Sequence, residues 1–222
     1  MLSLIIPFYN DSGCPIPFVA ELKKEFKGIN YELILVDDCS SDSTPEELES
    51  LKDINVHVIY NKQNLGYGGA IITGLNRGKG DILGFTCGDG ETSPKDIVRV
   101  YKNTNNFAVT KAVRINRKDG LRRKLISRVF NSLNKLRFNM LLEDINGYPF
   151  FLKKEVYNEL CDLRTDWLFN IDLIGKILSK GHRINGFVIE HQKRLEGKSH
   201  VYPKNIIKMV IEYIKYRGFN EK

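Results

Sequence analysis

The sequence has no long apolar segment. None of its 222 residues belongs to a run of about 18 consecutive apolar residues, the length at which a helix can span a bilayer. A basic amino-terminal region followed by a small-residue cleavage site is also missing. We therefore expect no membrane-spanning helix and no signal peptide, and we expect a cytoplasmic protein.

Paired cysteines are missing as well. Four cysteines, Cys14, Cys39, Cys87 and Cys161, lie far apart and form no C-x-x-C pair. Their spacing to the four histidines is not that of a zinc site. We therefore expect reduced thiols, as in a reducing compartment.

Positive charge is in excess. The net charge of +7 favours anionic partners such as nucleotide phosphates, nucleic acid or an acidic membrane surface. Residues 111–128 contain eight basic residues and one acid. Such a run usually forms a solvated face of a helix. The alternative is a phosphate-binding segment, in which each arginine can donate two parallel hydrogen bonds to one phosphate. Nucleic-acid binding favours interleaved aromatic residues, and because only Phe130 lies nearby we expect no nucleic-acid partner.

Apolar runs alternate with helical patterns in the first hundred residues. The runs 2–7, 32–36, 56–60 and 82–86 predict strands, and helices are expected between them and from Pro94 onward. This alternation is typical of an α/β fold with a mostly parallel central sheet flanked by helices. The loops 7–11, 37–42, 64–69 and 87–93 should then meet at the edge where parallel strands end and ligands bind.

The second half is less regular. We expect strands at 107–113 and 183–190, a short strand after the loop 142–149, and a helix at 167–178 that ends before Gly181. Residues 1–200 should form one domain. Residues 201–222 should form a basic amphipathic helix that either packs on this domain or lies on an acidic membrane surface.

Carboxylates follow two of the predicted strands. Asp89 and Glu91 lie in the turn after 82–86, where they could hold a hard cation, although an ordinary acidic turn is the alternative. Asp38 follows 32–36, where it could accept a hydrogen bond from a base imide or simply cap a helix. The glycines after residue 65 do not form G-x-G-x-x-G, because Ile71 replaces the third glycine, so no dinucleotide site is expected.

Five motifs occur in one order along the chain. They are Ile5-Ile6-Pro7-Phe8-Tyr9-Asn10, Val36-Asp37-Asp38-x-Ser40-x-Asp42, Asn64-x-Gly66 through Ala70, Cys87-Gly88-Asp89-Gly90-Glu91, and the pair Asp144-Ile145-Asn146-Gly147-Tyr148-Pro149 and Arg194-x-x-Gly197-x-Ser199. Over residues 2 to about 200 the chain resembles family 2 glycosyltransferases, which have the Rossmann-like GT-A fold. The last pair resembles the polyprenyl-phosphate branch, the dolichol-phosphate-mannose-synthase-like enzymes.

The resemblance implies a site for a nucleotide-diphosphate sugar. The residues it assigns to the donor are Pro7, Tyr9, Asn10, Asp38, Asn64, Gly66, Gly88, Arg194 and Ser199. Asp89 and Glu91 would hold Mg²⁺ or Mn²⁺, which would neutralise the leaving diphosphate. Cys87 stands where the family usually has a first aspartate, and a neutral thiol is a poor ligand for Mg²⁺.

The resemblance also implies an acceptor side. Arg114, Arg117 and Arg123 would bind an acceptor phosphate. Asp144 and Asp89 would be the catalytic residues. Asp144 would deprotonate an acceptor hydroxyl. If the acceptor is an ionised phosphate, Asp144 would instead orient the sugar or a basic residue.

The expected activity is an inverting, metal-dependent sugar transfer to a polyprenyl phosphate at the cytoplasmic membrane face, with peripheral membrane contact. The alternatives are transfer to a saccharide hydroxyl in polysaccharide assembly, or a non-catalytic nucleotide-sugar-binding module.

Overall fold

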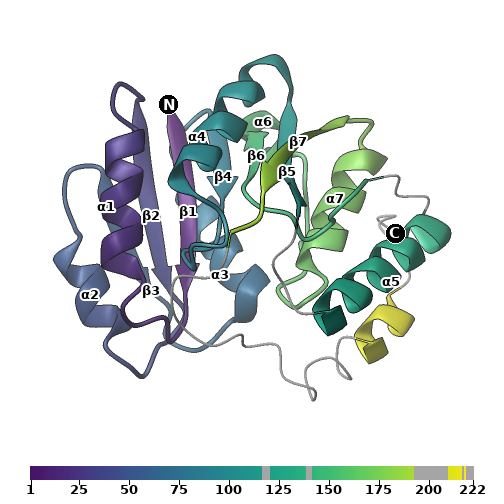
Figure 1. Ribbon diagram of the computed structural model, residues 1–222, viewed down its shortest axis with the longest axis horizontal. Helices are drawn as coiled ribbons and strands as arrows, with labels where there is room; N and C mark the ends of the chain where they lie inside the picture. The colour runs from purple at the N-terminus through teal and green to yellow at the C-terminus, as the bar shows by residue number, and fades with distance from the viewer. Residues whose placement is uncertain (117–120, 139–141, 193–209, 217, 219–222) are drawn as a thin grey trace.

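A mixed sheet runs through the middle of the protein. The computed structural model describes residues 1–116, 121–138, 142–192, 210–216 and 218. Within these residues seven strands pair in the order β3-β2-β1-β4-β6-β5-β7 (Figure 1). The strands are β1 (Leu2–Phe8), β2 (Tyr31–Asp37), β3 (Val56–Tyr60), β4 (Ile82–Phe85), β5 (Val109–Ile115), β6 (Phe150–Lys153) and β7 (Ile184–Glu190).

The direction of the strands creates one functional edge. Strands β1 to β4 are mutually parallel, β6 is antiparallel to both of its neighbours β4 and β5, and β7 is parallel to β5. Every strand except β6 therefore ends at the same edge, which we call the carboxyl edge and which lies at the bottom of Figure 1. The predicted mostly parallel α/β sheet is confirmed.

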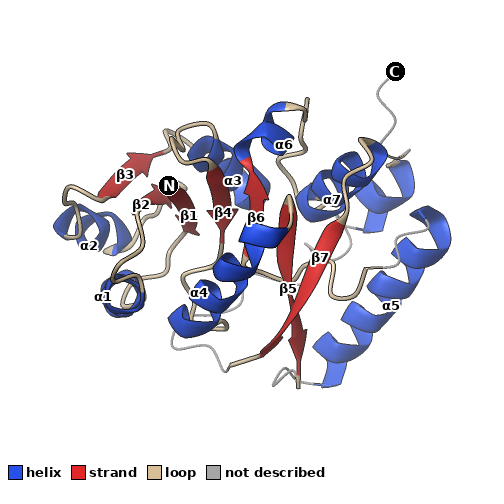
Figure 2. Ribbon diagram, turned by 90° about the horizontal axis from the view of Figure 1, so that it is seen from above, coloured by secondary structure: helices blue, strands red, loops and turns tan. Residues whose placement is uncertain are grey.

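Helices cover both faces of the sheet (Figure 2). They are α1 (Pro15–Glu25), α2 (Thr44–Ser50), α3 (Gly66–Leu75), α4 (Pro94–Asn103), α5 (Leu121–Phe138), α6 (Lys154–Asn158) and α7 (Phe169–Ser179), with a 3-10 turn at Thr104–Asn106. Helices α1 and α4 pack with Leu4 and Ile6 on one face, and α3 and α7 pack with Ile5 on the other. Because β1 is buried on both faces, its sequence is a continuous apolar run.

The start of α3 fits closely against the segment that leads into α7. A Cβ atom on Gly68 would lie 2.7 Å from Phe169 Cβ and 2.8 Å from the Thr165 carbonyl oxygen. Gly69 N–H also donates a hydrogen bond to that carbonyl, at 3.1 Å. Helix α3 begins at Gly66, whose φ is +78°. Glycine here therefore allows close packing of two segments about a hundred residues apart.

Two boundaries differ from expectation. The short helix α6 was not predicted, and β5 runs from Val109 to Ile115, two residues later than expected. The later boundary places Arg114 inside the strand, where its side chain is buried. The predicted start of α4 at Pro94 is confirmed, and α2 also has a proline in its first turn.

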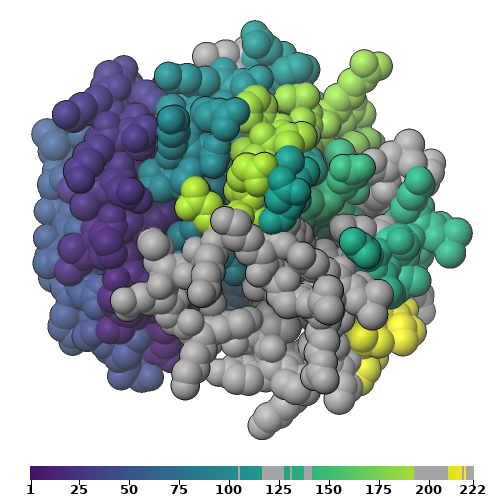
Figure 3. Space-filling view, viewed as in Figure 1, coloured from purple at the N-terminus to yellow at the C-terminus, as the bar shows by residue number. Residues whose placement is uncertain are grey.

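A carboxyl-terminal helix lies against α5. Residues 210–215 are helical and lie beside the end of α5 (Figure 3). Arg137 of α5 donates hydrogen bonds to the carbonyls of Tyr213, Ile214 and Tyr216. Tyr216 is buried and donates to Asp172 Oδ1 of α7, at 2.7 Å. This part of the predicted terminal helix therefore packs on the domain, whereas residues 201–209 lie outside the described residues. The described helices include none with the length and apolar character needed to cross a membrane.

Candidate active site

Five buried side chains form an ion cluster at the carboxyl edge. Asp89 and Glu91 follow β4, Arg114 lies in β5, and Asp144 and Tyr148 lie in the loop before β6. We call them the central cluster. Arg114 donates from Nε to Asp144 Oδ2 at 2.8 Å and from Nη2 to Asp144 Oδ1 at 3.0 Å, and its Nη1 lies 3.8 Å from Glu91 Oε2. The Tyr148 hydroxyl donates to Glu91 at 3.0 Å and contacts Asp89 at 3.4 Å.

Asp144 is held by Arg114 as an ionised group. Burial by itself would raise the pKa of Asp144, but the charge and hydrogen bonds of Arg114, together with the charge of Lys111, lower it to about 2. The Arg114 backbone N–H also donates to Asp144 Oδ2, at 3.0 Å. A carboxylate this acidic is a weak base near neutral pH. The arrangement favours the second predicted role for Asp144, which is to orient a basic residue.

Lys111 is buried next to the Arg114–Asp144 pair. Its side chain is fully buried, and its Nζ donates to the carbonyls of Ala112, Glu143 and Asp144 at 2.9, 3.2 and 2.7 Å. Burial lowers the pKa of Lys111 to about 8, against the attraction of Asp144. Lys111 and Arg114 belong to the basic segment of the sequence, yet both are buried in β5, so they are not part of a solvated helix face.

The buried lysine predicts a distinctive pH dependence. The unfolded chain keeps the Lys111 proton up to about pH 10.5, whereas the folded chain releases it near pH 8. The unfolded state therefore binds more protons in this window, and the contribution of Lys111 to stability rises with pH. We expect the free energy of unfolding of the wild type minus that of Lys111→Met to increase by about 3 kcal/mol across the window. Urea titrations at several pH values would measure it, and parallel curves for the two chains would contradict it.

Asp89 and Glu91 are suited to one kind of metal site. Mg²⁺ in phosphate-transfer sites is typically held by one or two carboxylates together with substrate phosphates and water. Two buried carboxylates that share the Tyr148 hydroxyl match this donor set. Desolvation and the charges of Asp89 and Glu91 raise the pKa of Cys87 well above its usual value, so its thiol stays neutral. Among the described residues there is no ready-made group of three or more His, Cys, Asp or Glu ligands.

Two of the residues predicted to bind the nucleotide sugar hold neighbouring loops of the carboxyl edge in place. Asp38 is buried and accepts hydrogen bonds from the N–H groups of Leu65 and Gly66, each at 2.9 Å, and from Asn61 Nδ2 at 2.8 Å. Asn10 accepts from Ser41 N–H at 2.8 Å. Asp38 therefore shapes the loop before α3, and Asn10 joins the first two loops of the carboxyl edge.

The other predicted donor residues occupy varied surroundings. Pro7 is half-buried, Tyr9 is exposed, and Asn64 accepts from Gly66 N–H at 3.0 Å. A Cβ on Gly88 would lie 2.3 Å from Phe8 Cε1, so glycine is needed there for packing. Arg117, Arg194 and Ser199 lie outside the described residues, as does the side chain of Arg123.

Sequence reasoning missed two residues of this edge as site residues. Tyr148 links the two carboxylates, and the buried His191, just after β7, has its Nε2 3.4 Å from Glu91 Oε2. The backbone N–H of Gln192 also donates to the Glu91 carbonyl, at 3.0 Å. One signal was available, because His191 directly follows a predicted strand that ends at the carboxyl edge.

The order of the strands and the loops at the carboxyl edge are those of an α/β protein with the GT-A fold. The chain belongs to glycosyl transferase family 2, whose family model matches residues 3–161. The predicted family and fold are thus confirmed.

Two similar proteins are named undecaprenyl-phosphate 4-deoxy-4-formamido-L-arabinose transferase. The protein from Yersinia pestis (strain Pestoides F) is 34% identical over 138 residues, covering 60% of this chain and 42% of the relative. The protein from Proteus mirabilis (strain HI4320) is 32% identical over 138 residues, with the same coverage. The chain therefore spans about two fifths of the length of these curated relatives.

A solved structure shares the fold. Glucosyl-3-phosphoglycerate synthase from Mycobacterium tuberculosis, in complex with Mn²⁺, UDP-glucose and phosphoglyceric acid, has a TM-score of 0.73 and 19% sequence identity. The match covers 96% of this chain and 77% of that one.

Proposed function

We propose that the protein is an inverting, metal-dependent glycosyltransferase that moves a sugar from a nucleotide-diphosphate sugar to a polyprenyl phosphate. The observation that carries this proposal is the central cluster, in which two buried carboxylates lie beside a buried arginine at the carboxyl edge. The names of the two transferase relatives support the choice of acceptor.

Each member of the cluster has a role in this proposal. Asp89 and Glu91 hold a divalent metal, and Tyr148 fixes the distance between their carboxylates. The metal supplies Lewis-acid neutralisation of the leaving diphosphate. Asp144 holds Arg114 in place through two hydrogen bonds, which leaves Arg114 Nη1 directed toward Glu91 as a positive charge for phosphate oxygens.

The low pKa of Asp144 favours the phosphate acceptor over a saccharide hydroxyl. A hydroxyl acceptor needs a base to remove its proton, and Asp144 with a pKa of about 2 does this poorly. The oxygens of a phosphate monoester are already ionised near neutral pH, so no base is required.

The remaining assignments follow the same proposal. Pro7, Tyr9, Asn10, Asp38, Asn64, Gly66 and Gly88 bind the nucleotide sugar, Arg194 and Ser199 bind its diphosphate, and Arg117 and Arg123 join Arg114 in binding the acceptor phosphate.

Peripheral membrane contact would use α5 and the helix 210–215. Their exposed apolar residues include Leu133, Leu136 and Ile214, which are 44%, 86% and 68% exposed. Lys135 and Lys215 are exposed on the same two helices. Apolar side chains with adjacent lysines suit the surface of an anionic bilayer, and this contact would place the protein at the cytoplasmic membrane face.

The test is release of nucleoside diphosphate from a panel of nucleotide sugars. Each reaction contains Mg²⁺, Mn²⁺ or EDTA, with or without a short polyprenyl phosphate. Release that requires both a metal and the lipid would support the proposal and identify the donor. Release stimulated by a saccharide would favour the alternative acceptor, and donor binding without release under any condition would indicate a binding module.

A further inference from the structure

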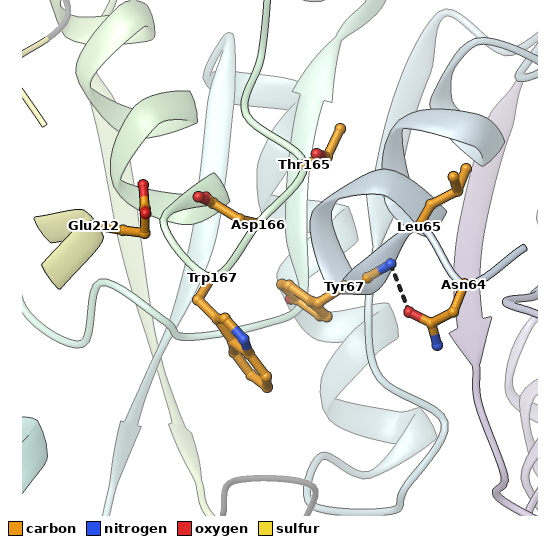
Figure 4. Close-up of a pocket in the computed structure, with 8 residues that line it drawn as sticks. Asn64, Leu65, Tyr67, Thr165, Asp166, Trp167 and Glu212 are labelled. Carbon is orange, nitrogen blue, oxygen red and sulfur yellow. Dashed lines mark hydrogen bonds between the residues drawn. The ribbon is translucent and has the colours of Figure 1, made fainter. Parts of the chain in front are cut away.

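A cavity of about 430 Å³ lies between α3, the segment before α7 and the carboxyl-terminal helix. Its lining includes Asn64 and Tyr67 at the start of α3, Asp166 and Trp167 before α7, and Glu212. In Figure 4 the side chains of Tyr67 and Trp167 project toward the same space, and Asn64 borders it. This volume is typical of small-molecule sites.

Close contacts hold the walls of the cavity together. The packing of Gly68 against Thr165 and Phe169 fixes its two long walls relative to each other. Asp166 accepts hydrogen bonds from Leu168 N–H and from Arg164 Nε, both at 3.0 Å. Arg164 Nη2 also reaches Glu212 Oε2 at 3.3 Å, so one guanidinium fixes both acids.

A chain of contacts joins the cavity to the central cluster. The hydroxyl of Tyr67 interacts with Asn170, whose Nδ2 donates to Asn146 Oδ1 at 3.0 Å. The Asn146 carbonyl in turn accepts from Arg114 Nη2, at 2.9 Å. The wall of the cavity is therefore connected to Arg114 through Asn170 and Asn146.

The chemistry of the lining selects a type of ligand. Two carboxylates, each about one third exposed, would repel a phosphate or another anion. Carboxylate and amide oxygens accept hydrogen bonds from hydroxyl groups. The faces of Trp167 and Tyr67 offer large apolar surfaces for the C–H face of a ring. This combination suits a molecule with hydroxyl groups at its rim, an apolar face and no negative charge.

We infer that this cavity binds a neutral sugar ring stacked on Trp167, with Asn64, Asp166 and Glu212 accepting hydrogen bonds from its hydroxyls. The inference rests on the proposed function and deepens it where the ring is the donor sugar, whereas a bound free saccharide would favour the alternative acceptor. The ring belongs either to the donor or to a saccharide acceptor, and the experiment separates these two sources.

Tryptophan fluorescence tests the inference directly, because Trp167 is the only tryptophan in the sequence. UDP-glucose, UDP-N-acetylglucosamine and GDP-mannose are each titrated beside UDP or GDP, in the presence of Mg²⁺. Cellobiose and maltose are titrated into the UDP-saturated protein, and calorimetry measures binding independently. A change in emission with a nucleotide sugar but not with its nucleoside diphosphate assigns the donor ring, whereas a change with a disaccharide assigns an acceptor.

Two variants provide a second readout. Trp167→Leu keeps apolar volume without an aromatic face, and Trp167→Phe keeps a smaller face. We expect Trp167→Leu to raise KM for the sugar-bearing substrate about tenfold and to leave the Kd of the nucleoside diphosphate unchanged. We expect Trp167→Phe to have a KM much closer to that of the wild type.

The outcomes distinguish this inference from the proposed function. If nucleotide sugars bind and turn over while Trp167 emission and the KM of Trp167→Leu stay unchanged, the cavity is no sugar subsite and the proposed function stands. An equal loss of nucleoside diphosphate affinity in Trp167→Leu would also overturn the inference. If no nucleotide or sugar binds to the wild type, both fail.

Discussion

Asp89→Asn is expected to lower kcat/KM for metal-dependent sugar transfer about 10³-fold. The substitution keeps the shape of the side chain but removes one of two buried carboxylates that we propose as metal ligands. Lewis-acid stabilisation of a leaving group contributes several kcal/mol, and each 1.36 kcal/mol corresponds to a tenfold change in rate. Nucleoside diphosphate release at saturating metal and lipid would measure the loss.

Asp162→Asn is a matched control for Asp89→Asn. Asp162 is exposed and has a φ of +47°, a conformation that asparagine adopts readily. The same chemical change at this position should leave kcat/KM within about twofold of the wild type. If Asp89→Asn retains full activity with an unchanged metal requirement, Asp89 is not a metal ligand.

Asp144→Ala is expected to lower the free energy of unfolding by about 3–5 kcal/mol, because it leaves the buried guanidinium of Arg114 without its main counter-charge. Activity should be lost as well, since the position of Arg114 depends on the two hydrogen bonds. Urea denaturation at neutral pH would measure the stability, and folding of the variant can be checked by circular dichroism.

A double variant separates stability from function. Replacing both members of a buried ion pair with apolar residues is often neutral or stabilising, so Asp144→Leu combined with Arg114→Met should regain much of the lost stability. It should remain inactive, because no positive charge is restored beside Glu91. Recovery of transfer activity in the double variant would show that the ion pair serves folding alone.

The pH dependence gives an independent check on the same pair. The pKa of Asp144 is lowered to about 2 in the folded protein, so the stabilising contribution is present above its unfolded value near 4 and is lost as the pH falls through 2. The stability advantage of the wild type over Asp144→Ala should therefore shrink across that acidic range.

Local patterns were sufficient to predict most strands. The runs at 2–7, 32–36 and 56–60 are strands in the structure. The first two are almost wholly buried, as parallel strands covered by helices on both faces are, whereas 56–60 forms the partly exposed edge strand β3. The proline-marked helix starts were predictable for a similar reason, since a missing N–H is tolerated in the first turn. The position of Asp89 and Glu91 at the carboxyl edge also followed from chain order alone.

Charge in a segment did not reveal where each charged side chain lies. The basic stretch 111–128 contains Lys111 and Arg114, which are buried, and also exposed Arg128. Whether a lysine is solvated or buried depends on carbonyls that belong to residues 143 and 144, about thirty positions further along the chain. No local pattern contains that information.

The sequence by itself determined the α/β alternation, the family and the loops that form the carboxyl edge. These properties follow from hydrophobic period, turn residues and motif order, which act over a few neighbouring residues. Only the tertiary structure decided that Arg114 binds Asp144, that Tyr148 and His191 meet Glu91, and that Trp167 faces Tyr67 across a cavity. These pairs lie 30 to 100 residues apart, and their contact depends on sheet order, which places β6 between β4 and β5.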